Sequence, residues 1–326
     1  MWQRFLRKNP YLFALLLLVV LIAINVNLQS NFFSLRAING NFRVLLPLML
    51  LAVGQSIVII GGGIDLSVGA IVSLVNVILV TRISPESGLL GVILAILLGC
   101  ASGMLAGAVN GVCVALLRLQ PIVTTYATSF IFSGLALLIL PRPGGQLPRA
   151  MTRFYRSTPL NIPVAVYVII VLLLIWGLVR GSRYGQYLFA TGSQADAAYT
   201  TGIPVLRVKF ASYVVAGLFS ALAALALTLG IGSGNARIGD AMTLESIVAV
   251  VLGGTRLRGG QGGVAGAIIG VAILGIIRNL ISFADVPTWY QTLVNASIIV
   301  LALAGPGAWQ LVARQFGKQR QLRRPA

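Results

Sequence analysis

Long apolar runs separated by short polar segments make up most of the chain. An α-helix needs about 20 apolar residues to cross the hydrocarbon core of a bilayer. Ten runs stand out, at roughly 11–28, 44–60, 65–81, 89–117, 121–140, 163–179, 210–230, 244–255, 262–280 and 288–305. The pattern predicts an all-α membrane protein with about ten transmembrane helices in a single domain, 1–326. The eighth run is too short to cross unaided, which predicts a broken or tilted helix.

The positions of the basic residues predict the orientation of these helices. An even number of spans puts both termini on one side, and Lys and Arg gather on the cytoplasmic side of membrane proteins. Basic residues flank both ends of the chain: Arg4, Arg7, Lys8, Arg314, Lys318, Arg320, Arg323 and Arg324. Both termini are therefore expected in the cytoplasm, with 307–326 as a basic tail. The segment 141–162 would lie outside despite its four arginines, and its prolines and glycines predict a loop.

Composition narrows the possible functions. The chain is 58% hydrophobic and 9% charged, and 24 Lys and Arg against 6 Asp and Glu give a net charge of +18. In a membrane protein such charges lie beside anionic lipid, so we expect membrane lipid and no nucleic acid as a partner. The chain has no histidine, the commonest metal ligand and general base. We therefore expect no metal site, no cofactor and no catalytic residue.

One carboxylate lies among four glycines in the stretch GGGIDLSVGA, residues 61–70. The glycines interrupt one helix, and the next would begin near Asp65, whose side chain can accept hydrogen bonds from the backbone N–H of Ser67 or Val68. We interpret Asp65 as an N-cap at a broken helix, with substrate or proton handling as the alternative. The residues of this broken-helix motif are Gly61, Gly62, Gly63, Asp65, Ser67 and Gly69.

A second glycine-rich stretch, SIVAVVLGGTRLRGGQGGVAG at 246–266, also has an apolar approach into a glycine turn. Broken helices in corresponding places of two repeats are typical of transporters and mark the translocation path. The two stretches therefore suggest an internal repeat. The residues of the second motif are Glu245, Gly253, Gly254, Gly259 and Gly260.

Neutral polar residues occur at membrane depth. Ser73 and Asn76 share one helix face, as expected of an aqueous path, although hydrogen bonds between helices explain each residue equally well. Amides and hydroxyls of this kind suit a hydroxylated substrate. The candidates for a translocation path are Gln55, Ser73, Asn76, Asn110, Gln291 and Asn295. A separate set of glycines at four-residue spacing predicts a close helix–helix contact: Gly99, Gly103, Gly107 and Gly111.

The polar segment 180–209 is expected to dock a partner. Within it, SQADAAYTTG has the features of a short helix, with Ser193 as N-cap, Asp196 three residues later and Gly202 at its end. The chain lacks the phosphate-binding pattern GxxxxGK[ST]. If a nucleotide drives this protein, another chain binds it.

Three stretches together resemble the permease subunits of ABC importers of the ribose and galactose type. They are GGGIDLSVGA at 61–70, GSQADAAYTTGI at 192–203 and LESIVAVVLGGTRLRGGQGGVAG at 244–266. The second stretch departs from the family pattern GxNxxAAxxxGI at Gln194, where the family usually has Asn. The positions that match are Gly192, Ala197, Ala198, Gly202 and Ile203.

The resemblance implies a multi-pass protein of the bacterial inner membrane that pairs with a second permease in a homo- or heterodimer. It implies that a cytoplasmic ABC ATPase docks on the coupling loop, 180–209, and that a periplasmic binding protein delivers a sugar, a pentose or a hexose. The superfamily also serves nucleosides and, more distantly, branched-chain amino acids. ATP-driven closure of the ATPase would move the docked helix and open the opposite face of the bundle.

An autonomous secondary transporter is the alternative hypothesis. In that case Asp65 or Glu245 would couple transport to protons. Such carriers usually place their carboxylates in a relay, whereas these two lie far apart in the sequence.

Overall fold

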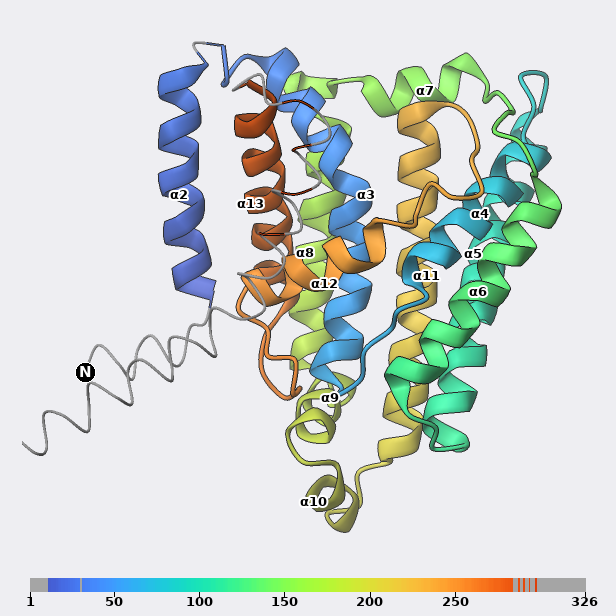
Figure 1. The fold of residues 1–326 in the computed structure, drawn as a ribbon, viewed down its shortest axis with the longest axis vertical. Coiled ribbons are helices and arrows are strands. Elements are labelled where there is room, and N and C mark those ends of the chain that lie inside the picture. The colour runs from blue at the N-terminus through green and yellow to red at the C-terminus, as the bar shows by residue number, and fades with distance from the viewer. Residues whose placement is uncertain are drawn as a thin grey trace, which may run out of the picture. The chain divides into compact units, whose positions relative to one another are not determined.

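The computed structural model describes residues 11–29, 31–283, 287, 290, 293 and 297. Every regular element within these residues is a helix, so the all-α class is confirmed (Figure 1). The helices are α2 (Tyr11–Leu28), α3 (Leu35–Ile60), α4 (Val68–Arg82), α5 (Leu89–Gly111), η1 (Val112–Leu116), α6 (Pro121–Ile139), α7 (Arg149–Arg156), η2 (Pro159–Asn161), α8 (Val164–Gly181), α9 (Arg183–Ser193), α10 (Ala195–Thr200), α11 (Val205–Ile231), α12 (Met242–Leu252) and α13 (Val264–Phe283).

Six helical segments in the described part are long and apolar enough to cross a membrane: α3, α5 with η1, α6, α8, α11 and α13. The apolar stretches of α2, α4 and α12 are shorter. Nine of the ten predicted runs thus form helices, in agreement with an all-helical membrane protein. Most of the tenth run, the residues Gln291 and Asn295 and the tail 307–326 lie outside the described residues.

The chain divides into a compact unit that ends at Ile277 and a second unit that begins at Arg278. The described part of the second unit starts with the end of α13. The contacts discussed below all lie within the first unit.

Helix α11 packs against α3, α4 and α5 in the centre of this unit (Figure 1). Among these contacts of α11 the closest is with α5, where a Cβ added at Gly107 would overlap the backbone carbonyl oxygen of Tyr213. A Cβ at Gly103 would lie 2.8 Å from the Cβ of Ala221. The predicted packing face of α5 is confirmed, because only glycine allows backbones to approach this closely.

The segment 141–162 is not simply a loop, and that prediction is wrong. It contains the amphipathic helix α7, whose three arginines are exposed. Tyr155 of this helix is 4% exposed. The burial of Tyr155 stabilises a helix that the flanking prolines and glycines did not indicate.

The segment 180–209 forms two helices, α9 and α10, instead of one. Ser193 is the last residue of α9, so its predicted N-cap role is wrong. Gln194 holds the N-cap position of α10, and its side chain makes no capping hydrogen bond. Gly202 ends the segment as predicted, with φ of +83° and with the N–H of Ile203 donating to the carbonyl of Ala198 at 3.1 Å.

Candidate functional site

The two glycine turns end their helices with the same backbone geometry. After α3, Gly61 has φ −72° and Gly62 has φ +83°; after α12, Gly253 has φ −69° and Gly254 has φ +87°. In each turn the first glycine donates its N–H four residues back and the residue after the pair donates five residues back. A left-handed second residue is the usual helix stop, and glycine takes it without strain. The local likeness of the two stretches is therefore real.

The two turns meet at one backbone group, the carbonyl of Ile60 at the end of α3. Gly260 donates its N–H to this oxygen at 2.9 Å. A Cβ added at Gly192, near the end of α9, would overlap the same oxygen and would lie 2.7 Å from the nitrogen of Gly260. A Cβ at Gly259 would lie 2.9 Å from the Cα of Gly62. We call Ile60, Gly62, Gly192, Gly259 and Gly260 the glycine junction.

The glycine junction joins three motifs that lie far apart in the sequence. It contains a residue of the broken-helix motif, one of the coupling loop and two of the second glycine motif. Its contacts join backbone atoms, so a change of side-chain rotamer cannot relieve them. The end of α9 therefore lies in direct backbone contact with the end of α3 and with the loop between α12 and α13.

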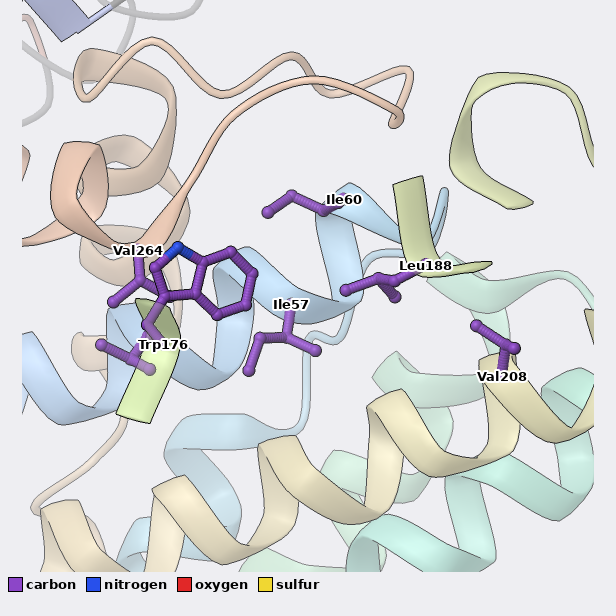
Figure 2. Packing of buried hydrophobic residues seen from close by; sticks show 7 residues of the cluster. Ile57, Ile60, Trp176, Leu188, Val208 and Val264 are labelled. Carbon is purple, nitrogen blue, oxygen red and sulfur yellow. The ribbon is translucent and has the colours of Figure 1, made fainter. Parts of the chain in front are cut away.

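Helix α9 is anchored beside the junction by an apolar cluster. Leu188 is fully buried, and its side chain would lie 3.1 Å from a Cβ at Gly61. Figure 2 shows the buried members of the cluster as sticks: Val53, Ile57, Ile60, Trp176, Leu188, Val208 and Val264. They come from α3, α8, α9, α11 and α13, so α9 is a packed part of the bundle. Burial raises the pKa of Tyr184 on this helix to about 12, and its phenol stays neutral at physiological pH.

The short helix α10 extends beyond this anchored region. Ala198 is buried, and Ile203 packs against the apolar cluster. Asp196 and Ala197 are exposed, and Tyr199 is 71% exposed. The matched family positions thus divide into residues that hold the segment to the bundle and residues that present an open face.

Asp65 lies in a buried hydrogen-bond cluster after the first turn. Its Oδ1 accepts from the backbone N–H of Ser67 at 2.8 Å and from the Ser67 hydroxyl at 2.7 Å. The amide of Asn110 on α5 donates to Ser67 Oγ at 2.7 Å and to Asp65 Oδ2 at 3.4 Å. Thr128 on α6 donates to Asn110 Oδ1 at 2.7 Å. We call these four residues the Asp65 cluster.

The predicted N-cap role of Asp65 is therefore only partly right. The bond to the N–H of Ser67 is present, but α4 begins at Val68 and Ser67 holds the N-cap position. The additional partners come from α5 and α6, which no local pattern reveals. Thr125 and Tyr213, which we had not assigned to this site, also hold the turn: Thr125 Oγ1 accepts from the N–H of Leu66 at 2.9 Å, and the Tyr213 hydroxyl lies 3.5 Å from the Ile64 carbonyl oxygen.

Ser73 and Asn76 of α4 are buried and bind protein groups. Ser73 Oγ accepts from the N–H of Gly239 at 2.9 Å, and the amide of Asn76 donates to Thr228 Oγ1 at 2.7 Å. Asn76 Oδ1 also accepts from the N–H of Asn235 at 2.9 Å. These bonds, together with a close approach of the backbones at Gly69 and Gly239, tie α4 to the segment after α11.

Two further candidate residues are Gln55 and Glu245. Gln55 is fully buried in α3, and neither its amide nitrogen nor its oxygen has a hydrogen-bond partner among the described residues. Glu245 is partly buried in the first turn of α12. In the described residues, no group of three or more His, Cys, Asp and Glu side chains is placed to hold a metal ion.

Comparison with known proteins agrees with the three motifs. A family model described as branched-chain amino acid transport system / permease component matches residues 37–303. The chain belongs to this permease family. The permease is 35% identical over 310 residues to the ribose import permease protein RbsC of Bacillus subtilis (strain 168), with 91% of each chain covered. No solved structure matches it.

Other relatives carry related transport functions. The permease is 30% identical to the galactose/methyl galactoside import permease protein MglC of Haemophilus influenzae, with 92% of this chain and 94% of the relative covered. It is 31% identical to the autoinducer 2 import system permease protein LsrD of Escherichia coli O9:H4, with 78% and 79% covered. The suspected ABC permease family is confirmed, and the chain is a membrane transport subunit rather than an enzyme.

Proposed function

We propose that the permease is the membrane subunit of an ATP-driven importer whose cargo is a sugar, a pentose or a hexose. Relatives named for ribose and for galactose align with about nine tenths of its length. The buried neutral amide of Gln55, which has no hydrogen-bond partner among the described residues, fits a polyhydroxy solute. In this function the permease sits in the bacterial inner membrane with both termini in the cytoplasm, and a periplasmic binding protein delivers the cargo.

Coupling to ATP would proceed through the glycine junction. The exposed face of α10, with Asp196, Ala197 and Tyr199, is the surface on which a cytoplasmic ATPase docks. Closure of two ATPases would displace α10 and the anchored helix α9. The contact of Gly192 with the Ile60 carbonyl would then move the end of α3. This contact is the observation that carries the proposal, because it joins the docking segment directly to a broken helix.

The contact of Gly260 with the same carbonyl would move the loop between α12 and α13 together with α3. The two broken helices would therefore respond as one element. A second permease, identical or homologous, would complete the translocation path between the two subunits.

Gln55 is the proposed cargo contact. A buried donor or acceptor without a partner costs about 1–3 kcal/mol, and a cargo hydroxyl that hydrogen-bonds to Gln55 during transport would remove this cost. Ser73, Asn76 and Asn110 already bind protein groups. We therefore assign these three to the structure of the bundle and Gln55 to the path.

Family membership gives no support to the proton-coupled alternative. Asp65 accepts three hydrogen bonds in the Asp65 cluster, a role that needs no proton transfer. ATP hydrolysis on a separate chain supplies the energy in the proposed function.

The test is uptake of radiolabelled pentoses and hexoses in proteoliposomes that contain the permease with its ATPase and binding protein. Gly192→Ala should lower ATP-driven uptake by roughly 100-fold, since a shift of about 1 Å in a positioned element can cost this much. Gly181→Ala is the matched control: it adds the same methyl group at the end of α8, where a Cβ meets nothing within 4 Å.

Two results would contradict the proposal separately. Uptake by the permease alone on a proton gradient, lost in Asp65→Asn, would refute the importer function. ATP-driven uptake at the parent rate in well-folded Gly192→Ala would refute the coupling role of the junction and leave the importer function standing.

A further inference from the structure

An apolar hollow lies beside α7, between this helix and helices α5 and α11. Its volume is about 400 Å³. Its lining consists of Ile96, Ala150, Met151, Phe154, Leu225 and Leu229, all of them apolar. Such a hollow favours an apolar occupant over ordered water, which needs polar partners.

Contacts outside the hollow hold α7 in place. The Tyr155 hydroxyl donates to the carbonyl of Arg43 on α3 at 2.9 Å. The amide of Asn39, also on α3, donates to the Arg156 carbonyl at 2.8 Å, and the Arg156 guanidinium donates to the Gly230 carbonyl on α11 at 3.2 Å. The hollow is thus preformed, because α7 is fixed to α3 and α11 without help from its contents.

Two arginines of α7 directly precede residues that line the hollow. Arg149 precedes Ala150 and Arg153 precedes Phe154, and the two arginines are one helical turn apart. Both side chains are exposed, and neither guanidinium has an ion pair or hydrogen bond with another described residue. The segment 141–163 contains four arginines and no Asp or Glu. Guanidinium groups in this arrangement match the oxygens of a phosphate.

The place of α7 in the bundle fits a lipid. Figure 1 shows α7 across the end of the bundle opposite to α9 and α10, close to the start of α8 and the end of α11. Helix ends of membrane proteins lie at the level of the lipid headgroups, where an amphipathic helix with basic residues rests. Phe154 is 66% exposed, which gives the hollow an open apolar side.

We propose that this hollow and its two arginines form a binding site for one anionic phospholipid. An acyl chain fills the hollow between Phe154, Leu225 and Leu229, and Arg149 and Arg153 bind the headgroup phosphate. An acidic protein partner would satisfy the arginines but would leave the apolar hollow empty, so the two features together favour a lipid.

Native mass spectrometry of the delipidated full-length permease tests the site. Phosphatidylglycerol and phosphatidylcholine with the same acyl chains are titrated separately. We expect one phosphatidylglycerol to bind at least about tenfold more tightly than phosphatidylcholine. Both lipids carry the phosphate, but the two arginines repel the choline cation of phosphatidylcholine, and phosphatidylglycerol has no such cation. The double variant Arg149→Gln/Arg153→Gln should abolish the preference.

A charge-matched control separates the site from net charge. Arg183→Gln/Arg207→Gln removes two exposed arginines near α9 and should leave the preference intact. Ala150→Leu fills part of the hollow and should weaken both lipids while both arginines remain. Equal loss of preference in the two double variants would overturn the proposal. Unchanged lipid binding in Arg149→Gln/Arg153→Gln with weakened capture of the binding protein would assign the arginines to that partner instead.

Discussion

The turn after α3 and the turn after α12 begin alike and are held differently. Each starts with two glycines of nearly equal backbone angles and the same hydrogen bonds. The first then enters α4 through the side chains of the Asp65 cluster, whereas the second passes through three more glycines with positive φ: Gly259, Gly260 and Gly262. The same helix stop can therefore lead into a side-chain clamp or into a closely packed backbone loop.

This difference has a mechanical consequence. Asp65, Ser67, Asn110 and Thr128 join the first turn to α5 and α6, which fixes it within the bundle. In the second turn the side-chain bond is long, with the N–H of Gly263 lying 3.4 Å from Thr255 Oγ1. We therefore expect the second turn to depend on backbone proximity and the first on polar side chains. Three pairs of variants test this expectation.

The largest effect is expected at Gly253. A Cβ there would overlap the carbonyl of Gly266 on α13, a backbone group that cannot rotate away. At the equivalent Gly61 a Cβ would lie 3.1 Å from Leu188 Cδ1, the end of a flexible side chain. Overpacking of this kind costs about 1–3 kcal/mol, and more when the backbone must shift. Gly253→Ala should therefore lower the midpoint of thermal unfolding in detergent by several degrees and abolish uptake. Gly61→Ala should keep most of both, and equal damage by the two variants would contradict the comparison.

Removal of the carboxylate should be the next largest effect. Asp65→Ala leaves the N–H and the hydroxyl of Ser67 buried without their acceptor, whereas Asn110 keeps its bond to Ser67 Oγ. We expect a cost of about 2 kcal/mol after the burial cost of the carboxylate itself is also removed. Asp65→Asn keeps an oxygen for the N–H of Ser67 and should lose less than half of that. Thermal unfolding and ATP-driven uptake of both variants would show this order, whereas complete loss of uptake in well-folded Asp65→Asn would assign Asp65 a role that needs its charge.

The smallest difference is expected between the second glycines of the two turns. Gly62 and Gly254 have φ of +83° and +87°, so alanine should cost about 1–2 kcal/mol at each from backbone strain alone. Both variants should therefore shift the thermal midpoint by a similar amount. A large difference between Gly62→Ala and Gly254→Ala would show that the surroundings, rather than the shared turn geometry, dominate at this position.

Particular residues show how far the sequence could predict the site. The ends of α3 and α12 and the stop at Gly202 followed from glycines, whose conformational freedom is local. The end of α9 did not follow from the sequence, because Ser193 has the features of an N-cap. Only the structure, in which Leu188 is buried, shows that α9 is a packed helix that continues to Ser193. Asn110 and Thr128 could not be assigned to Asp65 because their contacts join residues far apart in the chain.

The sequence by itself determined the helical membrane class, the positions of the glycine turns and the permease family, because apolar length, glycine stops and motif order are properties of short segments. The tertiary structure alone decided that Gly192, Ile60 and Gly260 meet, that the Asp65 cluster joins the start of α4 to α5 and α6, and that α7 lines an apolar hollow. The physical reason is that these features depend on how closely two backbones approach, and this distance is set by the packing of the whole bundle.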